Sequence, residues 1–496
     1  MPLCRIRSAD IYPPYARFNA SRSPCGWIAS VRIRIGNSVF PCRGCHHTRH
    51  SKVKRFANRH ASARRYCYGI CAKPRKQTGH DKNLLRHFFS ALGPGLITGA
   101  ADDDPSGIAT YTIAGAQLGT SLLWTALLTW PLMGCVQFIC ARIGMVTGLG
   151  LGAALKKKIP RWMLVLAALA LFGANSINIG ADLFGMADAG EMLSGFNSHL
   201  LIILFGIAIA FWTVRCTYDQ IAAILKWLAL CLFAYVVTAF VVKPHWATIV
   251  RDTFVPTWPK NHATWQNLVA ILGTTISPYL FFWQSSQEVE TEKTMGRRIV
   301  VQRRNATRRE LIDRKLDVGT GTFFSNFVMY FIILTAAATL HQHGKTSIET
   351  SRQAAEALRP LAGTFAYFLY AAGLIGVGLL AVPTLSGSAA YAFAETFNWS
   401  QGLDEKFRSA PAFYIVVIFS IGLGIAMDFL KINPITALFW TAVINGVLAP
   451  FLLAGILLVA FDKKIMRNQP ASMLSRVVIA IALLLMFISA IAMFVL

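Results

Sequence analysis

The chain has 496 residues, of which 55% are hydrophobic, and this composition excludes an ordinary soluble multidomain protein. Its formal net charge is +25, but residues 1–87 carry 19 Lys and Arg against only Asp10 and Asp81, so 17 of the excess charges lie outside the hydrophobic body. This distribution argues against a nucleic-acid-binding protein and predicts a polytopic membrane protein with basic loops.

Residues 1–87 form a basic segment that is rich in Arg and Ser and has no apolar run long enough for a signal peptide or a membrane span. We expect it to be largely disordered, because it shows no hydrophobic periodicity. Three origins remain open: an organelle transit peptide, a basic tail lying on anionic lipid, or translation from an upstream start codon, which we favour. Cys42, Cys45, Cys67 and Cys71 have spacings found in haem-attachment and zinc sites, but a Cys-bearing tail produces such spacings easily.

The first hydrophobic stretch, residues 88–114, is predicted to be a membrane span with a break at its centre. The three consecutive aspartates from Asp102 to Asp104 lie mid-span, where a carboxylate costs several kcal/mol and is rare outside ion or substrate pathways. Because Pro105 has no backbone N–H and Gly107 tolerates most dihedral angles, the helix should unwind after Asp104. The freed carbonyls and the carboxylates would line an oxygen-rich pocket that suits a divalent cation. A loop between two short helices is the alternative, but the flanks are too short to span separately.

From residue 88 onward, hydrophobic runs of about 20 residues predict eleven transmembrane helices and an all-α membrane domain. After the first span, the runs lie at 120–145, 161–189, 198–216, 220–243, 264–290, 317–340, 361–395, 411–430, 434–461 and 475–495. The loops are too short for a soluble catalytic domain, and this region contains no GxSxG, HExxH or Walker-type motif, so we expect neither an enzyme nor a bound cofactor.

The loop charges predict the orientation. Basic residues at 156–158, 293–315 and 463–467 follow the second, sixth and tenth spans. All three follow even-numbered spans, so the positive-inside rule places the N-terminus in the cytoplasm and the C-terminus outside. The compact loops favour a bacterial inner membrane, and the transit-like N-terminal segment leaves an organelle membrane open.

The sixth span repeats the features of the first, because Gly273, Ser277 and Pro278 again put small residues and a proline at mid-membrane depth. Two interrupted helices at corresponding positions of two halves indicate a binding site between inverted repeats. We therefore predict one repeat at 88–243, a second at 264–461 and an extra helix at 475–495. A simple proline kink is the alternative for the sixth span alone.

The interrupted helices also carry a family resemblance. Its residues are Gly93-Pro94-Gly95, Asp104-Pro105-Ser106-Gly107-Ile108 and, five spans later, Ile276-Ser277-Pro278-Tyr279. In these motifs and in the number of spans, residues 88–496 resemble the natural resistance-associated macrophage protein (Nramp) family of divalent metal transporters. The resemblance implies two inverted five-helix repeats of LeuT-like type, with the metal held between broken helices one and six.

The resemblance assigns candidate ligands in the first span. The family motif Asp-Pro-Gly-Asn places the metal-binding aspartate at Asp104 and the asparagine at Gly107, and the carbonyl ligand one turn earlier falls on Ala101. Gly107 has no side chain with which to bind. Asp103 is a further candidate ligand, although Asp102 and Asp103 could instead attract the ion from a vestibule or hold a second, hydrated shell, since successive helical residues point about 100° apart.

In the sixth span, the family motif Met-Pro-His places the methionine at Ser277 and the histidine at Tyr279, and a carbonyl ligand falls on Thr274. The third span resembles the family's proton-pathway motif Asp-Leu-Ala-Glu, with the aspartate kept as Asp182 and the glutamate replaced by Gly185. Asp182 and Tyr279 are therefore candidates for a proton or polar pathway.

Further polar residues lie within the spans, and interhelical hydrogen bonding is the default interpretation for most of them, including Asn178. We rank Gln284 and Asn326 above that default, because they lie on the presumed inner helices. Gln284 joins the candidate proton or polar pathway.

These departures change the expected chemistry. Methionine sulfur is a soft ligand that favours iron and manganese, whereas a hydroxyl and water have no such bias. An oxygen-only site suits magnesium, which keeps several waters when one or two carboxylates bind it. The chain thus resembles the Nramp-related subgroup that moves magnesium as well as manganese. The loss of the histidine and the glutamate favours passive, voltage-driven uptake over proton coupling.

We predict a secondary transporter or facilitator for divalent cations, namely manganese, magnesium or both, with iron as a further candidate. The ion is the transported substrate, and the lipid bilayer is the other expected partner. The alternative is an ion-coupled symporter of a small organic solute on the same fold. The acidic residues at the break argue against it, because they would repel a substrate carboxylate.

Overall fold

The structure is a computed structural model that describes residues 18–21, 28–35, 38–42, 94–215, 230–259, 261–430 and 433–495. The chain divides into two compact units, Met1–Lys82 and Asn83–Leu496, which are described separately.

The first unit contains a three-stranded antiparallel sheet. Its strands, in the order β1-β2-β3, are β1 (Phe18–Ser21), β2 (Ile28–Ile35) and β3 (Ser38–Cys42). Residues 31–35 alternate apolar residues with arginine, which is the period of a strand. The expectation that residues 1–87 are largely disordered stays a prediction. Cys45, Cys67 and Cys71 lie outside the described residues.

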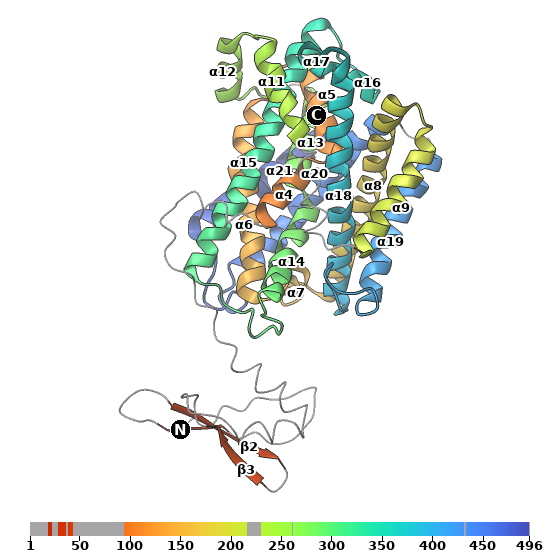
Figure 1. The fold of residues 1–496 in the computed structure, drawn as a ribbon. Helices are drawn as coiled ribbons and strands as arrows, with labels where there is room; N and C mark the ends of the chain where they lie inside the picture. Colours follow the sequence, from red (N-terminus) through yellow and green to blue (C-terminus); the bar gives the residue numbers. More distant parts are fainter. Residues whose placement is uncertain are drawn as a thin grey trace, which may run out of the picture. The chain divides into compact units, whose positions relative to one another are not determined.

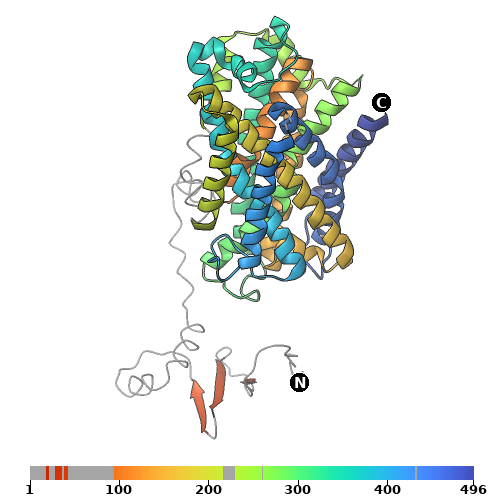
Figure 2. The same cartoon turned by 90° about the vertical axis from the view of Figure 1, so that its right-hand side faces the viewer.

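The second unit is a helical bundle whose spans run roughly along one direction (Figures 1 and 2). In chain order its α-helices are α4 (Pro94–Asp102), α5 (Pro105–Leu118), α6 (Trp124–Thr147), α7 (Leu151–Leu155), α8 (Arg161–Ser194), α9 (Ser198–Arg215), α11 (Phe233–Val241), α12 (Trp246–Phe254), α13 (His262–Thr275), α14 (Pro278–Thr294), α15 (Arg308–Thr339), α16 (Ser351–Ala355), α17 (Arg359–Ala362), α18 (Ala366–Phe397), α19 (Pro411–Ala426), α20 (Pro434–Ala460) and α21 (Met473–Val495). Figure 1 shows α7 at one end of the bundle and α12, α16 and α17 at the other.

The all-α membrane fold predicted from the sequence is confirmed. Within the described residues, 8 helices are long and apolar enough to cross a membrane. The first and sixth spans are each divided in two, as α4 with α5 and α13 with α14. The fifth span is represented by α11, and residues 216–229 before it lie outside the described part of the chain.

The seventh span is longer than the predicted 317–340, because α15 begins at Arg308. Thr307 and Glu310 form a capping box, in which the threonine side chain accepts the Glu310 amide and the glutamate accepts the Thr307 amide. Hydropathy alone misses this charged first segment, whereas the capping residues specify where the helix starts.

The seventh span packs along both halves of the broken first span. The Gly95 amide donates to the Asp317 carboxylate (2.8 Å), and a Cβ atom at Gly99 would lie 2.4 Å from the Gly321 carbonyl. Beyond the break, a Cβ at Gly115 would lie 2.4 Å from the Ile333 carbonyl oxygen. Glycine therefore allows α4 and α5 to approach α15 closely, and α15 aligns the two halves.

The sixth span has related contacts in the other half. A Cβ at Gly144 of α6 would lie 2.4 Å from the Ser285 carbonyl of α14, and a Cβ at Gly273 of α13 would lie 2.3 Å from the Gly446 amide of α20. The first span (α4 and α5) thus packs on the seventh (α15). The sixth span packs on the second and tenth, with α14 against α6 and α13 against α20. This arrangement fits the predicted inverted repeats, whose boundaries stay a prediction.

Candidate metal-binding site

The break in the first span is built around Asp104, which caps the N-terminus of α5. One carboxylate oxygen accepts the Gly107 amide (2.7 Å) and the Ser106 hydroxyl (2.6 Å). Pro105 follows at the first helical position, where its missing N–H costs no hydrogen bond. The helix was predicted to unwind after Asp104, but α4 already ends at Asp102, so Asp103 and Asp104 both lie in the unwound segment. The Asp-Pro-Ser-Gly sequence restarts the helix as α5 and holds the Asp104 carboxylate inside the bundle, only 2% exposed.

The third span adds two polar side chains to this carboxylate. Asn178 of α8 donates to the other Asp104 oxygen (3.2 Å). Asp182 lies one turn further along the same helix, is fully buried and interacts electrostatically with Asp104 and with the Ser106 amide. Neither Asp182 oxygen has a hydrogen-bond partner of standard geometry among the described residues. The carboxylates of Asp104 and Asp182 thus lie close together inside the bundle, and the Asp182 oxygens have lone pairs free to bind a cation.

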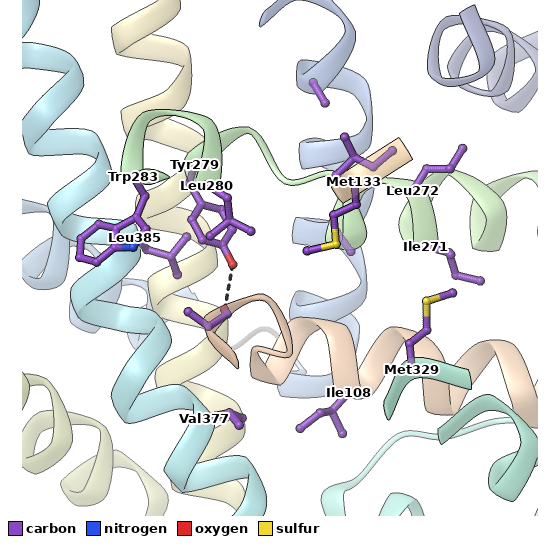
Figure 3. Packing of buried hydrophobic residues seen from close by; sticks show 14 of the residues in the cluster. Ile108, Met133, Ile271, Leu272, Tyr279, Leu280, Trp283, Met329, Val377 and Leu385 are labelled. Atoms are coloured by element: carbon purple, nitrogen blue, oxygen red, sulfur yellow. Dashed lines mark hydrogen bonds between the residues drawn. The ribbon is translucent and has the colours of Figure 1, made fainter. Parts of the chain in front are cut away.

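The two broken spans are joined directly across the site. The buried Tyr279 hydroxyl, from the start of α14, donates to the Ala101 carbonyl near the end of α4 (3.2 Å; Figure 3). The Tyr279 carbonyl in turn accepts the Ser388 hydroxyl of α18 (2.6 Å). Tyr279 therefore holds the candidate carbonyl ligand of the first break against the sixth helix.

The break in the sixth span lies between Thr275 and Pro278. The Ser277 hydroxyl donates back to the carbonyls of Gly273 (2.9 Å) and Thr274 (2.6 Å). A Cβ at Gly107 would lie 3.1 Å from the Thr274 hydroxyl oxygen. The structure therefore brings Thr274 and Gly107 together. Because Gly107 has no side chain, the Thr274 hydroxyl and the Asp102 carbonyl oxygen lie next to its Cα atom.

Two of the predicted residues lie apart from Asp104. Asp103, with Asp102, contacts Ser325 of α15 rather than α8. Gln284 donates to Glu288 (2.8 Å), which pairs with Arg314 (2.7 Å). Gln284 thus belongs to a polar network that joins α14 to α15, on the side of the break toward the start of α15.

The charge balance at the break favours a cation. Within the described residues, no basic side chain forms an ion pair with any of the four buried aspartates at positions 102, 103, 104 and 182. Buried carboxylates without a positive partner are strongly unfavourable. A bound cation with oxygen ligands would supply the missing charge.

The sequence matches a known protein family over most of its length. The profile described as "Natural resistance-associated macrophage protein-like" matches residues 95–496. The chain belongs to the Nramp family. This membership agrees with our predictions that the chain is not an enzyme and that a metal is cargo rather than a cofactor.

Two bacterial relatives illustrate the similarity of this Nramp chain to known proteins. The Divalent metal cation transporter MntH of Aeromonas hydrophila is 25% identical over 341 residues, which cover 66% of this chain and 80% of that protein. The MntH of Yersinia enterocolitica is 29% identical over 307 residues, or 60% of this chain and 71% of that protein.

Solved structures show the same fold. The Eremococcus coleocola manganese transporter, in complex with an aromatic bis-isothiourea compound, matches with a TM-score of 0.65 at 16% identity, covering 84% of this chain and 89% of that one. Mhp1, a nucleobase-cation-symport-1 transporter, matches with a TM-score of 0.50 at 16% identity, covering 81% and 90%. The predicted LeuT-like arrangement of the Nramp chain is thus confirmed, and these likenesses concern the fold alone.

The sequence offers too little reason to weight Asn178 and none to name Ser325. Asn178 lies four residues before Asp182, so the two share one face of α8, and this spacing was the available signal. Ser325 directly precedes Asn326, which bonds to Thr129 instead (2.6 Å). No sequence pattern indicates that the serine, rather than the asparagine, faces the break.

Proposed function

We propose that this Nramp protein carries divalent metal cations across a bacterial plasma membrane, with the ion bound where the first and sixth spans unwind. The observation that carries the proposal is the buried Asp104 carboxylate at a helix break, without a basic side chain paired to it among the described residues. The names of the similar proteins support divalent metal cations as the substrate class. The organic-solute alternative is not favoured.

The ligand set proposed for the ion contains oxygen atoms only. Asp104 supplies a carboxylate, and the carbonyls of Ala101 and Thr274 are the further candidate ligands. Asp103, the other carboxylate proposed from the sequence, faces Ser325 instead. Ser277 occupies the position of the family's methionine, and its proton is directed at backbone carbonyls. Because such a site has no preference for soft ions, we propose that it accepts Mg²⁺ as well as Mn²⁺.

We further propose that the membrane potential is sufficient to drive uptake. A Cβ at Gly185, the position of the family's glutamate, would lie 3.0 Å from Leu438 and 3.7 Å from Pro105, so its surroundings are apolar. Tyr279 takes the place of the histidine, and its hydroxyl donates a hydrogen bond to the Ala101 carbonyl. A divalent cation gains about 4.6 kcal/mol per 100 mV, so uptake requires no proton.

Proteoliposomes test this function. The purified chain should take up both Mn²⁺ and Mg²⁺ under an inside-negative potential, while a pH dye inside the vesicles reports no acidification. Protein-free vesicles with the same potential are the control. Acidification that depends on the metal would refute uncoupled uptake, and uptake of neither ion by a monodisperse preparation would refute metal transport.

The basic loops support a cytoplasmic N-terminus. Lys158 pairs with Asp462 (2.5 Å), and this hydrogen bond lowers the pKa of Asp462 to about 2, so the carboxylate is ionised at neutral pH. The Asn305 amide donates to the Val146 carbonyl (3.0 Å). The loops after the second, sixth and tenth spans thus meet at the α7 end of the bundle, which we assign to the cytoplasm.

Thiol labelling tests this orientation. Arg298 lies on the exposed surface at the α7 end, and Ser347 is exposed in the loop after α15. In intact cells, a membrane-impermeant maleimide should label Ser347→Cys and not Arg298→Cys. Permeabilised cells should show labelling of both, and the reverse pattern in intact cells would invert the topology.

A further inference from the structure

Asp102 and Asp103 form a second acidic cluster on the opposite side of the break from Asn178. The Ser325 hydroxyl of α15 faces one oxygen of Asp102 (2.8 Å) and one of Asp103 (3.1 Å). A hydroxyl has one proton, so it can satisfy only one of these oxygens fully at a time. Two carboxylates therefore converge on a single donor.

The surroundings of this cluster leave further oxygen atoms unsatisfied. Asp102 is 0% and Asp103 is 5% exposed, so neither lies in an open vestibule. The second oxygen of Asp102 lacks a hydrogen bond of standard geometry among the described residues, and the buried hydroxyls of Tyr111 and Thr274 interact only weakly with each other. Tyr111 also interacts electrostatically with Asp102 and Asp103. Several oxygen atoms thus surround this place, without a basic side chain to balance them.

The cluster lies on the α4 side of the break. Asp102 is the last residue of α4, whereas Asp104 caps α5 and contacts α8. The packing of α4 along α15 continues from Ser325 through Gly321 to Asp317, which accepts the Gly95 amide at the start of α4. These contacts between α4 and α15 extend from the break toward the start of α15, away from Asp104.

We propose that Asp102, Asp103 and Ser325 form a second cation station, which binds a partly hydrated divalent cation between Asp104 and the α7 end of the bundle. This inference rests on the proposed transport function and extends it. Two carboxylates with a hydroxyl and retained waters are a ligand set that suits a hard divalent cation. Two adjacent stations would also let an ion leave Asp104 without passing directly into an apolar region, as multi-site permeation requires.

Equilibrium binding of Mn²⁺ to the purified full-length chain tests the second station. Asp104→Asn removes the charge of the first site, so this variant should bind Mn²⁺ more weakly than wild type but measurably. The triple variant, with Asp102→Asn and Asp103→Asn added, should lose that residual binding. Asp104→Asn combined with Asp188→Asn is the matched control, and it should keep the residual binding because the Asp188 carboxylate of α8 accepts the Ser351 amide instead of facing the break.

Ser325→Ala in the Asp104→Asn background gives a second, milder variant that keeps both carboxylates. It should weaken the residual affinity by about 10- to 100-fold, the usual effect of removing a group that orients metal ligands. Each variant is compared at equal monodispersity in size-exclusion chromatography.

Two results would overturn the second station: no Mn²⁺ binding to Asp104→Asn when wild type binds and transports, or residual binding that persists in the triple variant. A wild-type chain that neither binds nor transports Mn²⁺ would instead refute the proposed function itself. The two failures are therefore distinguishable.

Discussion

Replacing Asp104 by asparagine is expected to reduce Mn²⁺ uptake into proteoliposomes by more than about 100-fold. Asparagine is as good an N-cap as aspartate, so α5 should still begin at Pro105 and the fold should persist. The change removes a buried charge on which the cation depends, and the loss of one partner of a buried ion pair costs about 3–5 kcal/mol. The expected defect is therefore in ion binding and transport rather than in stability.

Asp188→Asn is the matched control for this prediction. Asp188 also lies on a spanning helix, α8, but its carboxylate accepts the Ser351 amide (2.9 Å), an interaction that asparagine can keep. Uptake by Asp188→Asn should be close to that of wild type. Uptake by Asp104→Asn at a similar level would show that the ion does not bind at the first break.

The second large effect is expected from Gly273→Val, which should prevent the bundle from assembling correctly. A Cβ at this position would lie 2.1 Å from the Ala442 carbonyl oxygen and 2.3 Å from the Gly446 amide, both backbone atoms that cannot rotate away. Overpacking in a filled interior costs about 1–3 kcal/mol and more where backbone must move. Fluorescence-detected size-exclusion chromatography after heating should show a much lower melting temperature, or no monodisperse peak.

Gly173→Ala provides the control for Gly273→Val. Gly173 lies within α8, and a Cβ there would meet nothing within 4 Å. Alanine is a better helix former than glycine by about 1 kcal/mol, so this variant should be as stable as wild type or slightly more stable. Equal melting temperatures for Gly273→Val and wild type would contradict the close packing of α13 on α20.

The sequence was sufficient to predict the two breaks, because local chemistry determines them. Pro105 and Pro278 remove backbone donors, Asp104 is a strong N-cap, and neither half of the first span is long enough to cross the membrane alone. The positions of the other spans follow from hydropathy, with errors where polar residues continue a helix, as at the start of α15.

The direction in which each acidic side chain points could not be predicted. Asp103 and Asp104 are adjacent in sequence, yet one contacts α15 and the other α8, because both lie in the unwound segment between Asp102 and Pro105. Likewise, the Ser277 hydroxyl could have faced the ion, but it donates to the backbone carbonyls of Gly273 and Thr274 in the preceding helix. Such choices depend on which partner helix supplies a donor, which is a property of the packed bundle.

The close contacts between helices could not be predicted from sequence patterns either. Small residues are frequent throughout the spans, so their abundance does not show which of them meet. The structure pairs Gly99 with Gly321 and Gly273 with Gly446. These contacts position the two broken spans against helices seven and ten, and thereby position the site.

The most direct test of the central claim is to locate bound Mn²⁺ by anomalous X-ray scattering from crystals of the full-length chain grown with the ion. The proposed function predicts an anomalous peak between the breaks of the first and sixth spans, within about 2.0–2.6 Å of an Asp104 carboxylate oxygen. The peak should be absent in Asp104→Asn crystals at that position. A well-occupied Mn²⁺ peak elsewhere in the bundle, with none at Asp104, would contradict the account.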